Sequence, residues 1–257
     1  IEIVYPADWT LARAAEAAGS AHRAPDLTVT TTVSFAALWL IPRLARFRAL
    51  RPDVEVYVSA NDRNVDLARG DVDVAIRYVS RESKIPAGAL AMFGERMLPV
   101  VRPAAARAPA AILRRPADLA NHVLLHLDDP EGRVPWLDWQ VWLAANGAAG
   151  PRPAGSLRFT QYDQVIQAAV AGQGVALGRL PLIAELLRER KLVAPFPKRF
   201  DSERGYVALV APGSAGREDV AGFVRWLDDE SAQLRRDVGA APAAAEPRAR
   251  RVSPSRR

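Results

Sequence analysis

The chain has 257 residues, of which 49% are hydrophobic, and a formal net charge of +6. This length is sufficient for the core of one or two domains. The sequence contains no cysteine and no apolar run of about 18 residues, which excludes disulfides, cysteine-ligated zinc and a transmembrane helix. Most of the positive charge lies in an alanine-, proline- and arginine-rich stretch at 236–257, which we expect to be a disordered basic tail rather than a nucleic-acid-binding element.

The first third of the chain alternates strands and helices. Apolar runs predict strands at 27–32, 54–60 and 71–78. Between them we expect a long helix at 34–50 and a short helix that ends before Gly70. This order is typical of a doubly wound α/β layer with parallel strands. An alanine-rich helix within residues 1–26 is predicted to be the remnant of a linker.

The remaining sequence predicts a second α/β lobe and a closing strand and helix. The expected strands are at 90–93, 96–101, 123–127, 157–160, 174–178, 193–196 and 204–211. The expected helices are at 161–171, 181–190 and 218–234, with a mixed turn and helix at 136–147. We therefore predict lobe I at 27–102 and 203–235 and lobe II at 103–202. We expect two crossing segments, near Met97–Arg102 and Asp201–Tyr206, to join the lobes as a hinge. A cleft between two hinged lobes is a recurrent ligand clamp.

Polar residues follow the predicted strands of the first lobe. In parallel sheets ligands bind at the carboxyl ends of the strands, where this sequence places Thr32, Ser34, Asn61 and Arg77. Arg77 ends an otherwise apolar strand, and a guanidinium there suits either a bidentate pair with a ligand carboxylate or a salt bridge between the lobes. Ser34 either binds a ligand or caps the helix that follows it. Thr32 either contacts a ligand or forms hydrogen bonds at the edge of the core. Asn61 either presents its side-chain amide to the cleft or forms a turn or helix start.

The second lobe offers three further candidates for the same cleft. His126 ends a predicted strand, where a single histidine serves either a ligand or the structure. Gln161 and Tyr162 begin a helix directly after a strand, so their side chains can face the cleft. Arg179 follows a buried strand, and we expect it to bind backbone or a neighbouring loop. We expect Tyr78 to serve either for packing or as part of the cleft rim, and Trp136, Trp139 and Trp142 to serve for packing.

The sequence gives little support for catalysis. Its three histidines have no metal-ligand spacing, and it has no nucleophile elbow, P-loop or dinucleotide-binding glycine motif. We therefore expect a protein that is not an enzyme and has no cofactor or metal. The first residues lack the features of a secretory signal, which is consistent with a cytoplasmic protein.

Three motifs occur together in this sequence, SFAALWLIPRL, DLARGDVDVAIRY and AAVAGQGVALGR. Over about 27–235 the chain resembles the effector-binding domain of LysR-type transcriptional regulators, and within them the subgroup of glycine-cleavage and β-lactamase activators. The resemblance implies a two-lobed α/β clamp of the type 2 periplasmic-binding-protein kind, with mixed, mainly parallel sheets. It also implies that a small carboxylate or amino-acid-like effector binds between the lobes.

The resemblance implies partners as well. Members of the family form homodimers or tetramers in which the first long helix, here Leu38–Leu50, packs antiparallel against the last helix, here Val220–Leu234, of a second subunit. They contact DNA through a winged helix-turn-helix, a pattern that the 26 residues before Leu27 do not show. We expect DNA contacts only through such a domain, and no membrane contact. Two alternatives stay open: a solute-binding protein of a transport system, or a truncated regulator that acts only by dimerisation.

Overall fold

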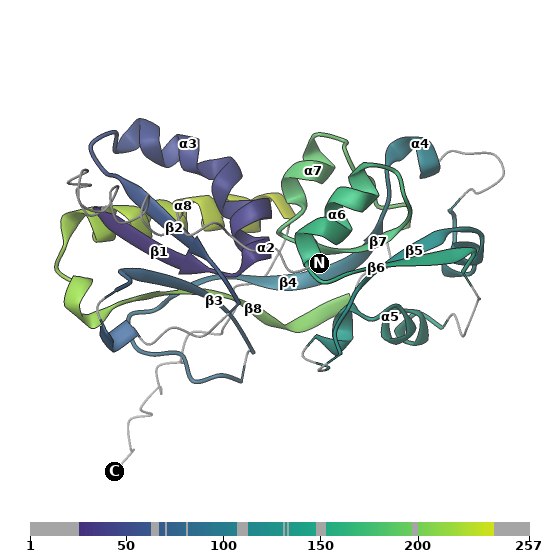
Figure 1. Cartoon of the computed structure of the whole chain (residues 1–257), viewed down its shortest axis with the longest axis horizontal. Helices are drawn as coiled ribbons and strands as arrows, with labels where there is room; N and C mark the ends of the chain where they lie inside the picture. Colours follow the sequence, from purple (N-terminus) through teal and green to yellow (C-terminus); the bar gives the residue numbers. More distant parts are fainter. Residues whose placement is uncertain are drawn as a thin grey trace, which may run out of the picture.

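The computed structural model of the chain describes residues 26–62, 67–69, 71–80, 82–106, 113–130, 132, 134–147, 153–196 and 200–238. Figure 1 shows two lobes side by side, joined by two long strands, β4 (Leu90–Val100) and β8 (Phe200–Val210). The predicted linker helix and most of the predicted basic tail lie outside the described residues. The first residues of that tail are helical, because α8 (Glu218–Val238) continues to Val238.

Lobe I is built on the strands β1 (Leu27–Thr31), β2 (Val56–Ala60) and β3 (Val74–Ser80). Strand β1 pairs in parallel with both β2 and β3, which confirms the predicted layer. Its helices are α2 (Val33–Phe35), the π-helix η1 (Ala36–Leu40), α3 (Ile41–Leu50), the short η2 (Leu67–Arg69) and α8. The first three follow one another directly, so the predicted long helix is confirmed with a π-helical segment inside it.

The two crossing strands carry the sheet from lobe I into lobe II. The sheet has the strand order β2-β1-β3-β8-β4-β7. Strand β8 runs antiparallel to β3 and β4, and β4 runs antiparallel to β7 (Ala176–Leu180). The predicted strands 90–93 and 96–101 are one continuous strand, because the interruption at Gly94 and Glu95 is absorbed by shifts of register against β8. The segments expected to act as a hinge thus belong to the two crossing strands and the residues beside them.

The mixed character of the sheets is confirmed, with a correction to the share of parallel pairs. Among the described strands, three ladders are parallel (β1–β2, β1–β3 and β5–β6) and three are antiparallel (β3–β8, β4–β8 and β4–β7). Parallel pairs are therefore half of the ladders rather than most of them. The physical reason is that β4 and β8 traverse both lobes in opposite directions.

Lobe II holds a two-stranded parallel sheet, β5 (Val123–Leu127) and β6 (Gly155–Phe159). Its helices are α4 (Pro103–Ala106), η4 (Pro116–Asn121), η5 (Pro135–Leu137), α5 (Trp139–Ala145), α6 (Tyr162–Val170) and α7 (Ala184–Arg188). The helix expected at 181–190 is thus shorter than predicted, and the last expected strand, 193–196, forms only a bridge between Val193 and Val101. Gly174 lies before β7, where a Cβ would be 2.5 Å from the Val123 carbonyl oxygen, so only glycine fits.

The hydrophobic core is continuous through the crossing strands. Phe35 and Trp39 pack on Phe93 and Tyr206, and the same cluster extends to Ile166 in α6. A smaller cluster lies within lobe II, where Trp139 and Trp142 meet edge to face, which confirms their predicted packing role. Each such buried aromatic side chain contributes on the order of 2–3 kcal/mol. Among the described residues no helix is both long and apolar enough to cross a bilayer.

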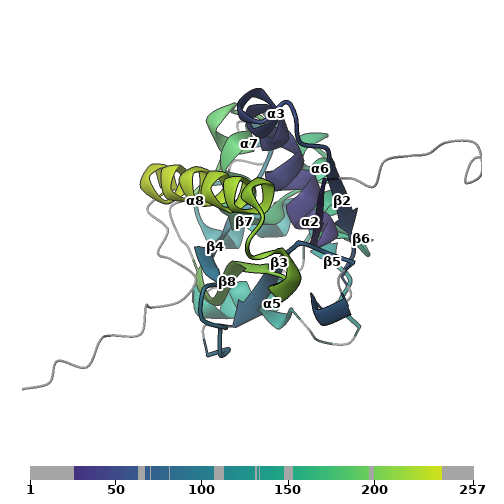
Figure 2. The ribbon, with the colours of Figure 1, turned by 90° about the vertical axis from the view of Figure 1, so that its left-hand side faces the viewer.

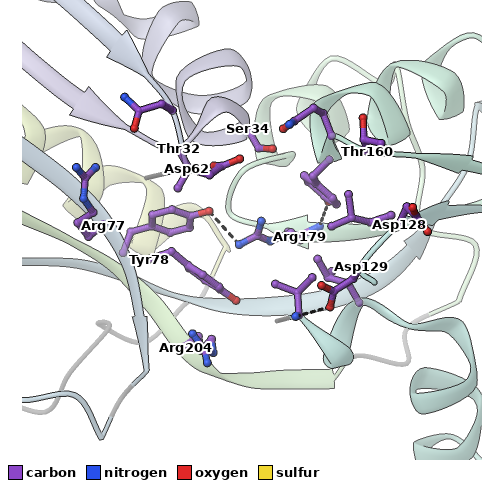
Figure 3. A pocket seen from close by; sticks show the side chains of 17 residues that line it. Thr32, Ser34, Asp62, Arg77, Tyr78, Asp128, Asp129, Thr160, Arg179 and Arg204 are labelled. Atoms are coloured by element: carbon purple, nitrogen blue, oxygen red, sulfur yellow. Dashed lines mark hydrogen bonds between the residues drawn. The ribbon is translucent and has the colours of Figure 1, made fainter. Parts of the chain in front are cut away.

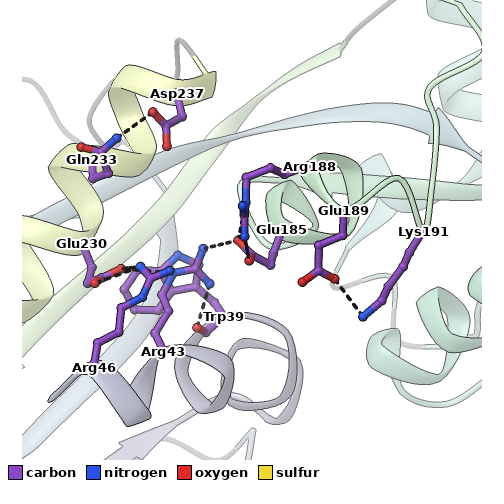
Figure 4. Close-up of polar contacts among 10 residues, drawn as sticks. All are labelled: Trp39, Arg43, Arg46, Glu185, Arg188, Glu189, Lys191, Glu230, Gln233 and Asp237. Atoms are coloured by element: carbon purple, nitrogen blue, oxygen red, sulfur yellow. Dashed lines mark hydrogen bonds and ion pairs between the residues drawn. The ribbon is translucent and has the colours of Figure 1, made fainter. Parts of the chain in front are cut away.

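Helices of the two lobes also meet behind the crossing strands, where α3 and α7 approach each other beside α8 (Figure 2). Arg43 of α3 is only 6% exposed and forms ion pairs with Glu185 of α7 at 3.9 Å and Glu230 of α8 at 3.5 Å (Figure 4). Arg46 binds the same Glu230 at 2.9 Å, and Arg188 pairs with Glu185. We call this group the rear ion-pair network; it borders a groove of about 580 Å³.

Candidate functional site

A cleft of about 310 Å³ opens between the lobes on the side of the strand ends (Figure 3). Residues after β1, β2 and β5 and at the start of α6 line its walls, and β3, β7 and β8 also contribute to it. The structure brings six of the seven predicted site residues together in its lining: Thr32, Ser34, Asn61, Arg77, Gln161 and Tyr162. The topology explains this, because the parallel strands of each lobe end at the edge that faces the cleft.

Thr32 and Ser34 have different roles at the start of α2. The Thr32 hydroxyl accepts a hydrogen bond from the Phe35 amide at 3.3 Å, so Thr32 is the N-cap. Ser34 lies two residues further along, in the first turn of the helix, and is 8% exposed. No described residue forms a hydrogen bond with its hydroxyl, and that hydroxyl is therefore available to a ligand. The capping role considered for Ser34 belongs to Thr32.

Arg77 is a half-buried cation in the wall of the cleft. Its guanidinium donates to the Ile76 carbonyl at 3.2 Å and to the Thr30 hydroxyl at 3.4 Å. Within the described part of the chain no carboxylate pairs with it, so the salt bridge between lobes considered above is not seen there. Burial lowers the pKa of Arg77 because the charged guanidinium is partly desolvated. A ligand carboxylate would compensate this charge.

Asn61 and Asp62 follow β2 on the same wall. The Asn61 amide nitrogen donates to the Thr31 carbonyl at 2.9 Å, which extends the β1–β2 pairing, and its side chain donates to Ser59. The Asp62 side chain lines the cleft as well. The sequence did not identify this carboxylate as a site residue, because an aspartate between a strand and a helix can equally serve as the N-cap of that helix.

Gln161 and Tyr162 bring α6 to the cleft. Gln161 occupies the N-cap position without a side-chain capping bond. The Tyr162 hydroxyl donates to the Leu177 carbonyl at 3.1 Å and accepts from the Arg179 amide at 2.6 Å. Burial raises the pKa of Tyr162, so the phenol stays neutral and holds α6 against β7.

A buried polar group that the sequence did not predict lies on the cleft's inner side. The Arg179 guanidinium binds the Glu95 carboxylate at 2.5 Å and lies 4.6, 5.0 and 5.8 Å from the ring centres of Tyr78, Tyr162 and Tyr206. Tyr78 donates a short hydrogen bond to Glu95, and Arg179 donates to Tyr206 at 2.9 Å. We call these five residues the Arg179 cage.

The charges within the Arg179 cage compensate each other. Burial alone would lower the pKa of Arg179, but the Glu95 carboxylate and the three phenols outweigh it and raise that pKa. Burial also raises the pKa of Tyr78 and of Tyr206, so both remain neutral. Because the arginine is fully paired, the cage presents rings and hydroxyls rather than a free cation. Arg179 thus binds a side chain rather than the backbone or loop expected from the sequence.

Arg204 adds a second cation from β8. Its guanidinium lies 4.3 Å from the Trp136 ring centre and 5.7 Å from that of Tyr78, and it lines the cleft. Cation–π contacts of this kind hold a guanidinium in place and leave its N–H groups able to bind an anion. In the sequence Arg204 is the last of four consecutive polar residues, 201–204, so its position did not single it out as a site residue.

His126 is not part of this cleft. It lines a neighbouring hollow of about 400 Å³ together with Asp138 and Arg158. Successive residues of a strand point to opposite faces, and Leu127 next to it reaches the cleft, so His126 faces away. Burial lowers the pKa of His126, and the Arg158 charge lowers it further. Among the described residues no group of three or more histidine or acidic side chains could hold a metal ion.

Comparisons with known proteins agree with this architecture. The profile of the family described as "LysR substrate binding domain" matches residues 20–232. The glycine cleavage system transcriptional activator of Escherichia coli K12 is 33% identical over 201 residues, which cover 78% of this chain and 63% of the relative. The transcriptional activator AmpR of Rhodobacter capsulatus is 30% identical over 213 residues, or 80% of this chain and 67% of the relative.

Solved structures show the same fold. The effector domain of AmpR from Pseudomonas aeruginosa is 29% identical, with a TM-score of 0.60, and covers 82% of this chain and 97% of that domain. The regulator CrgA of Neisseria meningitidis has a TM-score of 0.59 at 18% identity, covering 86% of this chain and 74% of that protein.

The predicted clamp fold of the type 2 periplasmic-binding-protein kind is thereby confirmed, and so is the prediction that the chain is not an enzyme. The chain spans 63% of the length of the E. coli glycine-cleavage activator that it matches. It belongs to the LysR substrate-binding-domain family and is an effector-binding domain of a LysR-type transcriptional regulator.

Proposed function

We propose that this domain senses a small carboxylate or amino-acid-like effector, which binds in the cleft with its carboxylate on Arg77. The observation that carries the proposal is the state of Arg77, a half-buried guanidinium without an ion pair among the described residues. A bidentate carboxylate would replace two weak hydrogen bonds by two charge-assisted ones. Ser34 and Gln161, which line the cleft from opposite lobes, would add hydrogen bonds.

Effector binding would shift the equilibrium between open and closed lobes. Ligand contacts from both lobes favour the closed arrangement, because each lobe alone supplies only part of the site. The crossing strands β4 and β8 connect the two lobes covalently, so a change in the angle between the lobes must bend or twist these strands. Their middle portion holds Glu95 and Tyr206 of the Arg179 cage, directly beside the cleft.

The output is proposed to be transcriptional control by a cytoplasmic homo-oligomer. Ile41 and Leu50 of α3 are 57% and 68% exposed, so this helix presents two large apolar side chains to solvent. We propose that α3 and α8 form the contact with a second subunit, and that DNA is bound through a domain outside this chain. Light scattering at micromolar concentration tests the oligomer, and a strict monomer would contradict it.

A thermal-shift screen of amino acids and other small carboxylates tests the effector, followed by calorimetry with the compounds that stabilise the protein. We expect Arg77→Ala to weaken binding of a carboxylate by about tenfold to a hundredfold, since a charge-assisted pair contributes about 1.5–3 kcal/mol. The matched control is Arg115→Ala, which removes an arginine that is 77% exposed and outside the cleft lining. Equal affinities of the Arg77 variant and the parent would remove Arg77 from the site.

A further inference from the structure

We propose that the cleft selects a ligand with two opposite charges at its ends, a carboxylate on Arg77 in lobe I and an ammonium group on Asp128 in lobe II. This inference rests on the proposed function, because it takes the cleft as the effector site. It specifies that the ligand also carries a positive charge and names the residue that binds this second charge. An aliphatic chain would join the two groups.

The first observation is the distribution of charge along the cleft. Figure 3 shows Arg77 at one end of the cleft and Asp128 and Asp129 at the other, with Arg179 between them. Asp128 directly follows β5, and its amide donates to the Phe159 carbonyl at 2.7 Å, which fixes its backbone at the end of the two-stranded sheet. Arg77 and Asp128 therefore place opposite charges on separate lobes, and Asp62 and Arg204 also line the cleft.

The second observation is that the Asp128 carboxylate is only weakly engaged. Its one ion pair among the described residues is with Arg158 at 3.8 Å, which is beyond hydrogen-bond distance. The two side chains are 45% and 65% exposed, and such surface pairs contribute little. Asp129 is different, because its carboxylate accepts the Val134 amide at 2.6 Å and so shapes the loop. Asp128 is thus the acid that can pair with a ligand, and Asp129 adds negative charge behind it.

The third observation concerns the space between the charged ends. The Arg179 cage has no net charge to offer there, because Glu95 neutralises Arg179. Leu127, Val134 and Leu137 of lobe II also line the cleft and favour an apolar segment of the ligand. The volume of about 310 Å³ suits a small ligand, since small-molecule pockets measure about 300–1,000 Å³. A dicarboxylate would place its second charge against Asp128 and Asp129.

Three compounds with the same chain length test this inference: ε-aminocaproate with both charges, caproate with the carboxylate alone, and hexylamine with the amine alone. Calorimetry on the parent should show ε-aminocaproate binding at least about tenfold more tightly than either of the others. Asp128→Asn should abolish the advantage over caproate and leave caproate binding unchanged. Asp62→Asn, which changes a carboxylate on the lobe I wall, should preserve that advantage. Thermal unfolding of each variant confirms that it is folded.

The outcomes separate the inference from the proposed function. Equal binding of ε-aminocaproate and caproate by the parent, or an advantage that survives Asp128→Asn, would overturn the inference while the carboxylate site stands. The inference would also be overturned if the tighter binding of ε-aminocaproate relative to caproate were lost in Asp62→Asn but kept in Asp128→Asn. Binding of hexylamine but not caproate, unaffected by Arg77→Met, would contradict the proposed function itself. Failure of all three compounds to bind would overturn the inference, while the thermal-shift screen of carboxylates decides the proposed function.

Discussion

Two regions between the lobes contain a buried or half-buried arginine. In one of them the arginine is paired with carboxylates, and in the other it is not. In the rear ion-pair network, Arg43 is 6% exposed, stacks on Trp39 and pairs with Glu185 and Glu230. In the front cleft, Arg77 is half-buried and has only neutral acceptors, Ile76 and Thr30, among the described residues. Burial lowers the pKa of both guanidiniums, but at Arg43 two carboxylates partly offset it.

The difference indicates which arginine serves the structure and which serves a ligand. A buried charge is costly unless it is paired, so a protein that only needs stability pairs it within the chain. Arg43 follows this rule, and so does Arg179 with Glu95. Arg77 departs from the rule at a cleft that opens to solvent, which is where a ligand can supply the missing charge. The following predictions test this contrast through the free energy of unfolding.

The largest loss is expected from Glu95→Gln, which leaves Arg179 buried without its carboxylate. Removing one partner of a buried pair costs about 3–5 kcal/mol. Urea denaturation measures this loss. As a control, Asp201→Asn removes a carboxylate that pairs with Arg96 at 2.7 Å but is 74% exposed, and should cost at most about 1 kcal/mol. Similar losses for both variants would show that the Arg179 cage is not a buried structural pair.

A smaller loss is expected from Arg43→Met, which removes the buried member of the rear ion-pair network. We expect about 1–3 kcal/mol, because Glu185 and Glu230 keep partial access to water and to Arg188 and Arg46. Arg46→Met is the matched control on the same helix and the same Glu230, and since Arg46 is 56% exposed it should lose less than about 1 kcal/mol. Equal losses for the two variants would refute the structural role of Arg43.

Arg77→Met should change the stability of the ligand-free protein by less than about 1 kcal/mol. It removes two weak hydrogen bonds and also the cost of a partly desolvated charge, and these effects oppose each other. Denaturation in the absence of ligand measures it beside Arg43→Met. A loss as large as that of Arg43→Met would mean that Arg77 is already paired in the folded protein.

The smallest effect concerns pH and His126. Burial and the Arg158 charge hold the pKa of His126 in the folded protein below that of the unfolded chain, which is about 6.5. As pH falls through this value the unfolded chain binds the proton first, so stability decreases, by less than about 1 kcal/mol, and the loss stops below the folded pKa. His126→Asn should remove this part of the pH dependence. Parallel stability curves for parent and variant between about pH 7.5 and 5.5 would exclude it.

Much of the cleft could be predicted from the sequence because it depends on local order. Thr32, Ser34 and Asn61 each follow a strand of one parallel layer, and Arg77 lies on β3 just beyond the part that pairs with β1. The ends of such parallel ladders share an edge. The same reasoning brought Gln161 to the cleft. It was insufficient for His126, because the strand end alone does not tell which of two successive residues faces the cleft.

The Arg179 cage could not be predicted in this way. Its members lie on β3, β4, β7 and β8 and at the start of α6, and they meet only through the antiparallel register of the crossing strands. That register depends on the irregularities around Gly94, which in the sequence separated β4 into two predicted strands. A single acid in an apolar strand, Glu95, was the available signal, since a buried carboxylate requires a partner.

The central claim is that the front cleft holds a ligand carboxylate on Arg77. The most direct measurement is a crystal structure of the domain with a carboxylate that stabilises it in the thermal-shift screen. Our account predicts both carboxylate oxygens within about 3 Å of the Arg77 guanidinium, with the ligand between the two lobes. A ligand bound elsewhere, with Arg77 still on the Ile76 carbonyl and the Thr30 hydroxyl, would contradict it.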